Sequence, residues 1–299
     1  MSTTDYGPIR VLTRGAYDLQ KLRISTGNRI VGNFRAKLGQ APGLKAEDEL
    51  SAEDQRMIVD LKHRHKRIAD ALAKKPRSRE FPGDELISSR AELALVGEYL
   101  NMESLEASNF RQLGKVLEDV PIYQEFLEEV RGIGPAMAGV IISEIDITKA
   151  RYVSSLWKYA GLDVANGKGR SRKEEHLVLR EYVTKDGEVK EKRSITYNPF
   201  LKTKLVGVLG ASFLRSASPY AQYYRDYRHR IESDPTREKV KKYDADNPTA
   251  WTPLRVHQAS IRYMVKRFLA DLYVAWRTLE KLPVAPDYHE AKLGHKHAA

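Results

Sequence analysis

The amino-acid sequence predicts a mostly α-helical protein with three parts: an N-terminal helical module at residues 1–118, a helix-hairpin-helix domain with one small β-hairpin at residues 119–285, and a flexible tail at residues 286–299. Apolar residues recur at helical spacing along most of the chain, and three prolines each follow a residue type that caps helices. Strand-like alternation is convincing in one short region. The 299 residues, 41% of them hydrophobic, suffice for one large or two ordinary domains.

The first 118 residues show helical patterns without strand character. A first helix is predicted over residues 16–38 and ends at a Gly/Pro-containing break at residues 39–43. A second is predicted to begin at Ser51, whose hydroxyl can cap the first turn while Asp54 follows three residues later. It should end before the break at residues 76–83, and two further helices are predicted at about residues 85–100 and 105–117.

Three helix starts are predicted in the second half, because Asn198, Ser218 and Thr252 each precede a proline suited to the first helical position. The last helix carries a wide apolar face and is expected to form the spine of its domain. That face comprises Val256, Ile261, Met264, Val265, Phe268, Leu272, Trp276 and Leu279. Residues 177–195 alternate around Asp186-Gly187, which predicts a β-hairpin with a tight turn.

The composition favours a polyanionic partner. There are 51 Lys and Arg against 40 Asp and Glu, giving a formal charge of +11 and a pI of about 9.5, so nucleic acid is the leading candidate. No stretch approaches the roughly 18 continuous apolar residues of a spanning helix, and a membrane partner is not expected. The chain has no cysteine, which excludes disulfides, thiolate zinc sites and cysteine nucleophiles. We expect a cytoplasmic, nucleoid-associated protein.

The segment of residues 122–144 has the pattern of two short helices joined by Gly132-Ile133-Gly134. The glycines permit backbone torsions that other residues avoid and let the chain approach a ligand closely. Pro135 then begins a helix in which the small residue Ala138 allows tight packing. Free backbone N–H groups from Gly132 to Ala136 would form an anion site suited to a DNA phosphate. The alternative is an ordinary glycine-containing turn between helices.

Three segments in a fixed order carry a family resemblance: Val130-Arg131-Gly132-Ile133-Gly134-Pro135, then Ser155-Leu156-Trp157-Lys158-Tyr159-Ala160-Gly161-Leu162, then Asn198-Pro199-Phe200-Leu201-Lys202. Their order resembles the C-terminal transposase domain of the Piv/MooV type. These insertion-sequence transposases join an N-terminal DEDD nuclease-like domain to a helix-hairpin-helix C-terminal half. The resemblance covers roughly residues 121–279, about half of the chain.

The resemblance implies DNA binding in transposition or site-specific recombination, with a guide RNA and further copies of the chain as partners. It also implies acidic ligands for Mg²⁺ or Mn²⁺ in the N-terminal domain and a reactive serine between the second and third segments. Ser171 and Ser194 are both candidates for that serine, and Ser171 is the preferred one because positive residues surround it. The basic residues expected to contact DNA are Lys168, Arg170, Arg172 and Lys202, together with Gly132, Ile133, Gly134 and Ala136 of the hairpin.

Two competing functions stay open. The N-terminal residues lack the strand ending in an aspartate that opens the family's nuclease-like domain, which favours a non-catalytic accessory protein. An RNA-binding module is the other, because Tyr220, Tyr223, Tyr224 and Tyr227 alternate with arginines and could stack on unpaired bases. Packing of these rings against the last helix is the favoured interpretation. The basic run at residues 62–67 is interpreted as a solvated helix face.

Overall fold

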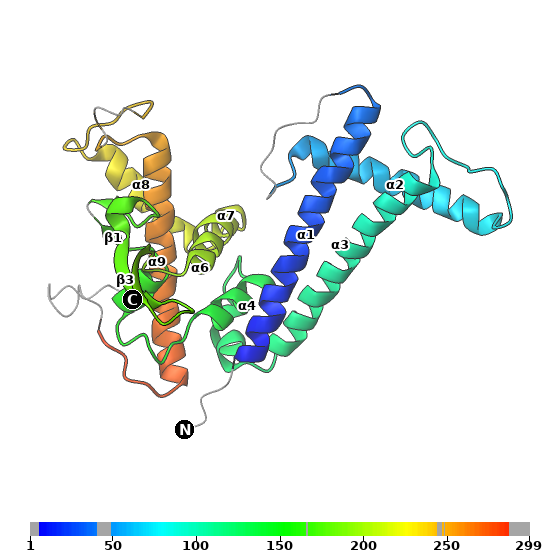
Figure 1. Cartoon of the computed structure of the whole chain (residues 1–299). Helices are drawn as coiled ribbons and strands as arrows, with labels where there is room; N and C mark the ends of the chain where they lie inside the picture. Colours follow the sequence, from blue (N-terminus) through cyan, green and yellow to red (C-terminus); the bar gives the residue numbers. More distant parts are fainter. Residues whose placement is uncertain (1–5, 41–48, 166, 244–246, 248, 287–299) are drawn as a thin grey trace. The chain divides into compact units, whose positions relative to one another are not determined.

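The computed structural model describes residues 6–40, 49–165, 167–243, 247 and 249–286, and it confirms a mostly helical fold with a small β-hairpin (Figure 1). The chain divides into two compact units, Val11–Gly114 and Met1–Arg10 with Lys115–Ala299. The predicted division at residues 118 and 119 stays a prediction. The predicted tail falls almost wholly outside the described residues, which end at residue 286.

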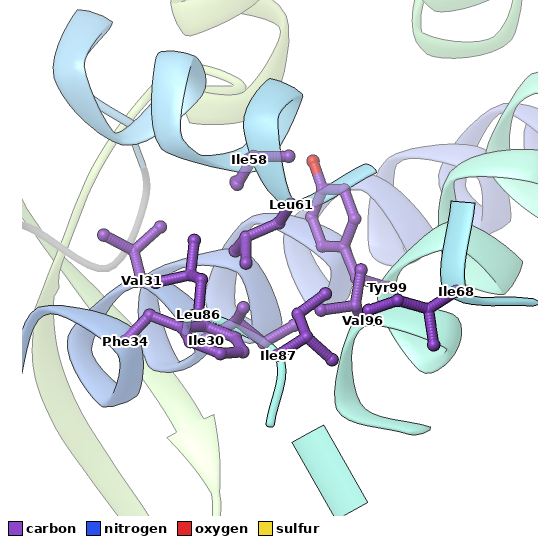
Figure 2. Packing of buried hydrophobic residues seen from close by; sticks show 10 residues of the cluster. All are labelled: Ile30, Val31, Phe34, Ile58, Leu61, Ile68, Leu86, Ile87, Val96 and Tyr99. Carbon is purple, nitrogen blue, oxygen red and sulfur yellow. The ribbon is translucent and has the colours of Figure 1, made fainter. Parts of the chain in front are cut away.

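The unit Val11–Gly114 is built from three helices, α1 (Gly7–Lys37), α2 (Ala52–Lys74) and α3 (Arg90–Leu117), the first and last of which continue into the other unit. Ser51 caps α2 as predicted, since its side chain accepts from the Asp54 N–H while Asp54 accepts from the Ser51 N–H. Apolar side chains of the three helices and of the segment before α3 form one core (Figure 2). Its buried members are Ile30, Val31, Phe34, Ile58, Leu61, Ile68, Leu86, Ile87, Val96 and Tyr99.

Two helix predictions in this unit are wrong. The first helix begins at Gly7 instead of residue 16, because Pro8 falls in its first turn, where proline is tolerated. The two helices predicted at residues 85–100 and 105–117 are one helix, α3. No proline separates them, and the intervening residues continue the helix. Its start at Arg90 follows from a second capping box, in which Ser89 and Glu92 exchange hydrogen bonds of 3.1 and 3.2 Å.

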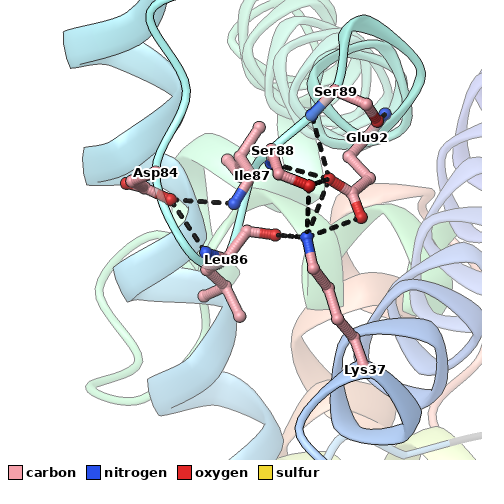
Figure 3. A network of polar contacts seen from close by, with 7 residues as sticks. All are labelled: Lys37, Asp84, Leu86, Ile87, Ser88, Ser89 and Glu92. Carbon is pink, nitrogen blue, oxygen red and sulfur yellow. Dashed lines mark hydrogen bonds and ion pairs between the residues drawn. The ribbon is translucent and has the colours of Figure 1, made fainter.

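A polar network holds the segment before α3 (Figure 3). The Lys37 ammonium donates to the backbone oxygen of Leu86 at 2.9 Å and pairs with Glu92 at 2.9 Å. Asp84 accepts hydrogen bonds from the backbone N–H groups of Leu86 and Ile87 at 3.0 and 2.8 Å.

The basic run at residues 62–67 is largely paired with acidic side chains, because Lys62, Arg64 and Arg67 all contact carboxylates. These contacts agree with the interpretation of that run as an ordinary helix face.

The second unit is organised by its long last helix, α9 (Pro253–Leu279), beside which α8 lies (Figure 1). Helices α5 and α7 also contact α9. The Thr252 hydroxyl accepts from the Arg255 N–H and caps α9 as predicted, and most of the predicted apolar face is buried. Leu279, however, is exposed. The remaining helical elements are η1 (Tyr123–Leu127), α4 (Pro135–Glu144), α5 (Val153–Tyr159), η2 (Glu174–His176), α6 (Pro199–Thr203), η3 (Lys204–Leu209), α7 (Gly210–Arg215) and α8 (Ala221–Ser233).

The tyrosine-rich helix α8 packs along α9. Tyr220 donates to Asp271 at 2.8 Å, Tyr224 contacts His257 at 2.8 Å, and Tyr227 stacks on Tyr263 with ring centroids 4.5 Å apart. These contacts support the packing interpretation over base stacking. The predicted start of this helix is wrong. It begins at Ala221, after a turn, and the buried Ser218 hydroxyl has no hydrogen-bond partner among the residues that the structure describes, so it does not cap the helix.

The predicted β-hairpin is present as β3 (Val178–Val183) paired antiparallel with β4 (Val189–Ser194). Gly187 takes φ +84° in its turn, which explains the glycine after Asp186. Nearly every residue of β3 and β4 is exposed, on both faces of the two-stranded sheet. The structure adds a pair that the sequence did not predict, β1 (Val164–Ala165) with β2 (Lys168–Gly169).

Candidate nucleic-acid interface

The predicted hairpin forms a bend between η1 and α4. Ile133 donates to the Val130 oxygen at 2.9 Å, and Met137 and Ala138 both donate to the Gly134 oxygen at 3.0 Å. Gly134 is exposed and Ala136 is half-buried. Within the described part of the chain, neither of these two residues has an acceptor for its backbone N–H. The bend therefore offers two unengaged donors beside the start of α4.

The two glycines of the bend differ in backbone torsion and in the space available for a side chain. Gly132 has φ +102°, and a Cβ there would lie 2.7 Å from Ser216 Oγ and 3.0 Å from Phe213 Cδ1. Ser212 Oγ also donates to its backbone oxygen at 2.7 Å. Gly134, by contrast, has φ −113°, and a Cβ there would meet no atom within 4 Å. The expectation that both glycines serve unusual torsions is therefore wrong for Gly134, whose missing side chain leaves the surface open.

The side chains around the bend carry mixed charge. Glu128, Glu129 and Arg131 are all exposed. Ile133 is half-buried, whereas Ala138 is fully buried where α4 packs, as predicted. Among Glu128, Glu129 and Arg131 the exposed carboxylates outnumber the cation, so attraction of an anion to the bend would depend chiefly on the backbone N–H groups and the positive end of the α4 dipole.

A second group of predicted residues gathers around β1 and β2. Arg170 pairs with Asp163 through two nitrogens, at 2.6 and 3.1 Å from Asp163 Oδ2, which raises the pKa of Arg170. The Lys202 ammonium donates to the backbone oxygen of Arg170 and lies 4.8 Å above the Tyr197 ring. Lys168 is half-buried and Arg172 is exposed. Arg170, expected to contact DNA directly, is thus already engaged by a carboxylate.

Ser171 contacts a histidine that the sequence analysis missed. Ser171 Oγ lies 2.8 Å from His176 Nδ1, and the Ser171 N–H donates to the same nitrogen at 3.0 Å. Because Nδ1 accepts that N–H, we assign the neutral tautomer with the proton on Nε2. Nε2 is buried without a hydrogen bond, and Glu175 Oε1 lies 3.8 Å away. The five-residue spacing across an irregular segment gives no recognisable sequence signal for this pair.

The other candidate serine lies elsewhere in the unit. Ser194 is the last residue of β4 and pairs with Val178 in the ladder. Ser171 instead follows directly on Arg170 and contacts the buried imidazole of His176. Of the two serines, the geometry therefore favours Ser171 as the one placed beside a proton acceptor.

The described residues bring together no group of three His, Asp or Glu side chains that could hold a metal ion. The acidic site for Mg²⁺ or Mn²⁺ that the family resemblance implies is therefore not found among them. Nor does any helix in the described ranges combine the length and apolarity needed to cross a bilayer.

Comparison with known proteins returns no relative. No protein-family model matches the chain, no curated protein matches it, and no solved structure matches its fold.

Proposed function

We propose that this protein binds DNA and acts as a transposase-like protein in DNA transposition or site-specific recombination, docking on the phosphate backbone through the bend at residues 132–136. The observation that carries the proposal is the open surface at Gly134, with the unengaged N–H groups of Gly134 and Ala136 beside it. Gly134 is the N-cap residue of α4, where glycine is tolerated, and its missing side chain lets a ligand approach the free N–H groups closely. The net charge of +11 favours an anionic ligand.

A salt titration with a variant of the bend tests this docking. Gly134→Val would place a branched side chain over the free N–H groups, and we expect duplex affinity to fall about tenfold for every DNA sequence alike, because backbone contacts read no bases. Wild-type affinity should fall log-linearly with salt concentration. Gly32→Val is the matched control, because Gly32 of α1 also has no atom within 4 Å of an added Cβ. Unchanged affinity in a folded Gly134→Val protein would refute docking through this bend.

A second function, strand transfer through Ser171, is favoured by the 2.8 Å contact between Ser171 Oγ and His176 Nδ1. In that reaction Oγ attacks the phosphorus of a phosphodiester and passes its proton to Nδ1. The bond from phosphorus to the leaving sugar oxygen breaks, and that oxygen takes a proton from solvent. The chain remains joined to DNA as a phosphoserine ester. We derive no step through a divalent metal, since the described residues do not supply its ligands.

One experiment separates the enzyme from the accessory and RNA-binding alternatives. Duplex, branched and single-stranded substrates are incubated with the protein, with and without Mg²⁺ or Mn²⁺, and both gel shift and cleavage are scored. Cleavage that is lost in Ser171→Ala supports the enzyme, and binding without cleavage supports the accessory protein. Preference for single-stranded RNA supports the third alternative. A guide RNA, further copies of the chain and a cytoplasmic, nucleoid-associated location belong to the same proposal.

A further inference from the structure

Three cationic side chains of the second unit are partly buried close to β1 and β2: Lys202 of α6 and Arg262 and Lys266 of α9. The Arg262 and Lys266 side chains form no hydrogen bond and no ion pair within the described ranges. The Lys266 ammonium lies 5.1 Å from the centroid of the Trp157 ring. The indole N–H of Trp157 donates to the backbone oxygen of Lys266 at 3.1 Å. Neither cation therefore has a carboxylate in hydrogen-bonding or ion-pair contact among the described residues.

The backbone of β2 lies close to one of these cations, the Arg262 guanidinium. A Cβ on Gly169 would lie 2.8 Å from Arg262 Cζ, so the missing side chain makes room for the guanidinium. Within the part of the chain that the structure describes, Asp163 is the carboxylate whose charge reaches Lys202 and Lys266, and Arg170 already binds it in bidentate fashion. Positive charge thus exceeds negative charge in the group.

The positive charges of Lys202, Arg262 and Lys266 are partly buried and repel one another. Burial lowers the pKa of Lys202, Arg262 and Lys266, and the nearby Arg262 lowers the pKa of both lysines further, while Asp163 acts in the opposite direction. A partly buried cation without a counterion is unfavourable, and proteins ordinarily pair such groups. A bound anion would remove both the desolvation cost and the mutual repulsion.

We propose that Lys202, Arg262 and Lys266 form a binding site for phosphate groups of duplex DNA, separate from the bend at residues 132–136. The guanidinium of Arg262 can bind two phosphate oxygens side by side, and the two ammonium groups act as point charges. Because Lys202 donates to the backbone oxygen of Arg170, the site borders Ser171. This inference rests on the proposed function, since it assigns DNA contacts to residues of α9.

Thermal unfolding in inorganic phosphate gives the first test. Phosphate should raise the wild-type Tm relative to chloride of equal ionic strength, because a ligand of the folded state stabilises it. Arg262→Met and Lys266→Met keep the apolar stem and should lose this rise. Without phosphate both variants should unfold at the same temperature as the wild type or higher, since an unpaired cation is gone. A phosphate effect that persists in both variants would show adventitious binding elsewhere and overturn the site.

DNA binding gives the second test. Lys266→Met and Lys202→Met should each weaken duplex binding about tenfold and reduce the salt slope by about 1. The control is Lys149→Met, in which an exposed lysine paired with Asp146 loses its charge, and affinity should stay within about twofold. Wild-type affinity in the Lys202 and Lys266 variants would overturn this inference and leave the proposed function standing. If phosphate stabilises the wild-type protein but the protein does not bind duplex DNA, both this inference and the proposed function would be overturned.

Discussion

Replacing Gly132 by alanine is expected to destabilise the second unit by about 2–6 kcal/mol, as the sum of two effects. The backbone conformation at φ +102° is unfavourable for residues with a Cβ and costs about 1–3 kcal/mol. The new methyl group would also lie 2.7 Å from Ser216 Oγ and 3.0 Å from Phe213 Cδ1. Such overpacking costs about 1–3 kcal/mol more. Phe213 is fully buried and has little freedom to move away.

Urea unfolding followed by circular dichroism measures this loss. Gly134→Ala is the matched control two residues away, and its unfolding free energy should stay within about 1 kcal/mol of the wild type, because the site is open and only the N-cap preference for glycine over alanine is lost. Adding Ser216→Ala to Gly132→Ala removes the closest contact and should recover part of the packing loss, while the contact with Phe213 and the torsional part remain. A Gly132→Ala protein as stable as the Gly134→Ala protein would refute the distinction drawn between the two glycines.

Three further predictions concern stability. Asn198→Ala should cost about 2–4 kcal/mol in urea unfolding, because Asn198 caps α6 and donates to the buried Glu144 at 2.7 Å; Asn198→Ser, which keeps a cap, should recover part of this. Ser89→Ala should cost about 1 kcal/mol by removing one half of the α3 capping box, and no change would contradict that cap. Burial raises the pKa of Tyr17 to about 12 from 10.0, so unfolding free energy should fall between pH 10 and 12, and Tyr17→Phe should remove that part of the loss.

The sign of the Tyr17 prediction follows from linkage. Below pH 10 the phenol is neutral in both folded and unfolded chains, and its burial contributes fully to stability. Above pH 10 the unfolded chain releases the proton first, so unfolding becomes easier as the pH approaches 12. Equal pH dependence of the wild type and Tyr17→Phe over this interval would show that the phenol is not desolvated on folding.

Local sequence patterns predicted the elements whose cause is local. Ser51 with Asp54, Asn198 before Pro199 and Thr252 before Pro253 each cap a helix as predicted, because capping depends on residues within one turn. Asp186-Gly187 closes the β-hairpin for the same reason. The failures also have local causes: Ser89 and Glu92 form a capping box that the predicted helix bounds did not include, and Ser218 precedes a turn in place of a helix.

The candidate interface shows the limit of such reasoning. The sequence identified the bend at Gly132 to Gly134, the basic residues around Ser171 and the surplus of positive charge. It gave no means to see that Gly132 is required by packing against Ser216 while Gly134 faces open space. Nor could it show that Asp163 engages Arg170.

The sequence by itself thus determined the helical class, the capped helix starts, the hairpin turn and the basic character of the chain, because each depends on neighbours along the chain or on composition alone. Only the tertiary structure decided which cations lack a partner and which serine meets a histidine. Arg262 reaches Gly169 from a helix about a hundred residues further along the chain, and the burial that isolates the charges of Arg262 and Lys266 exists only after α9 has packed.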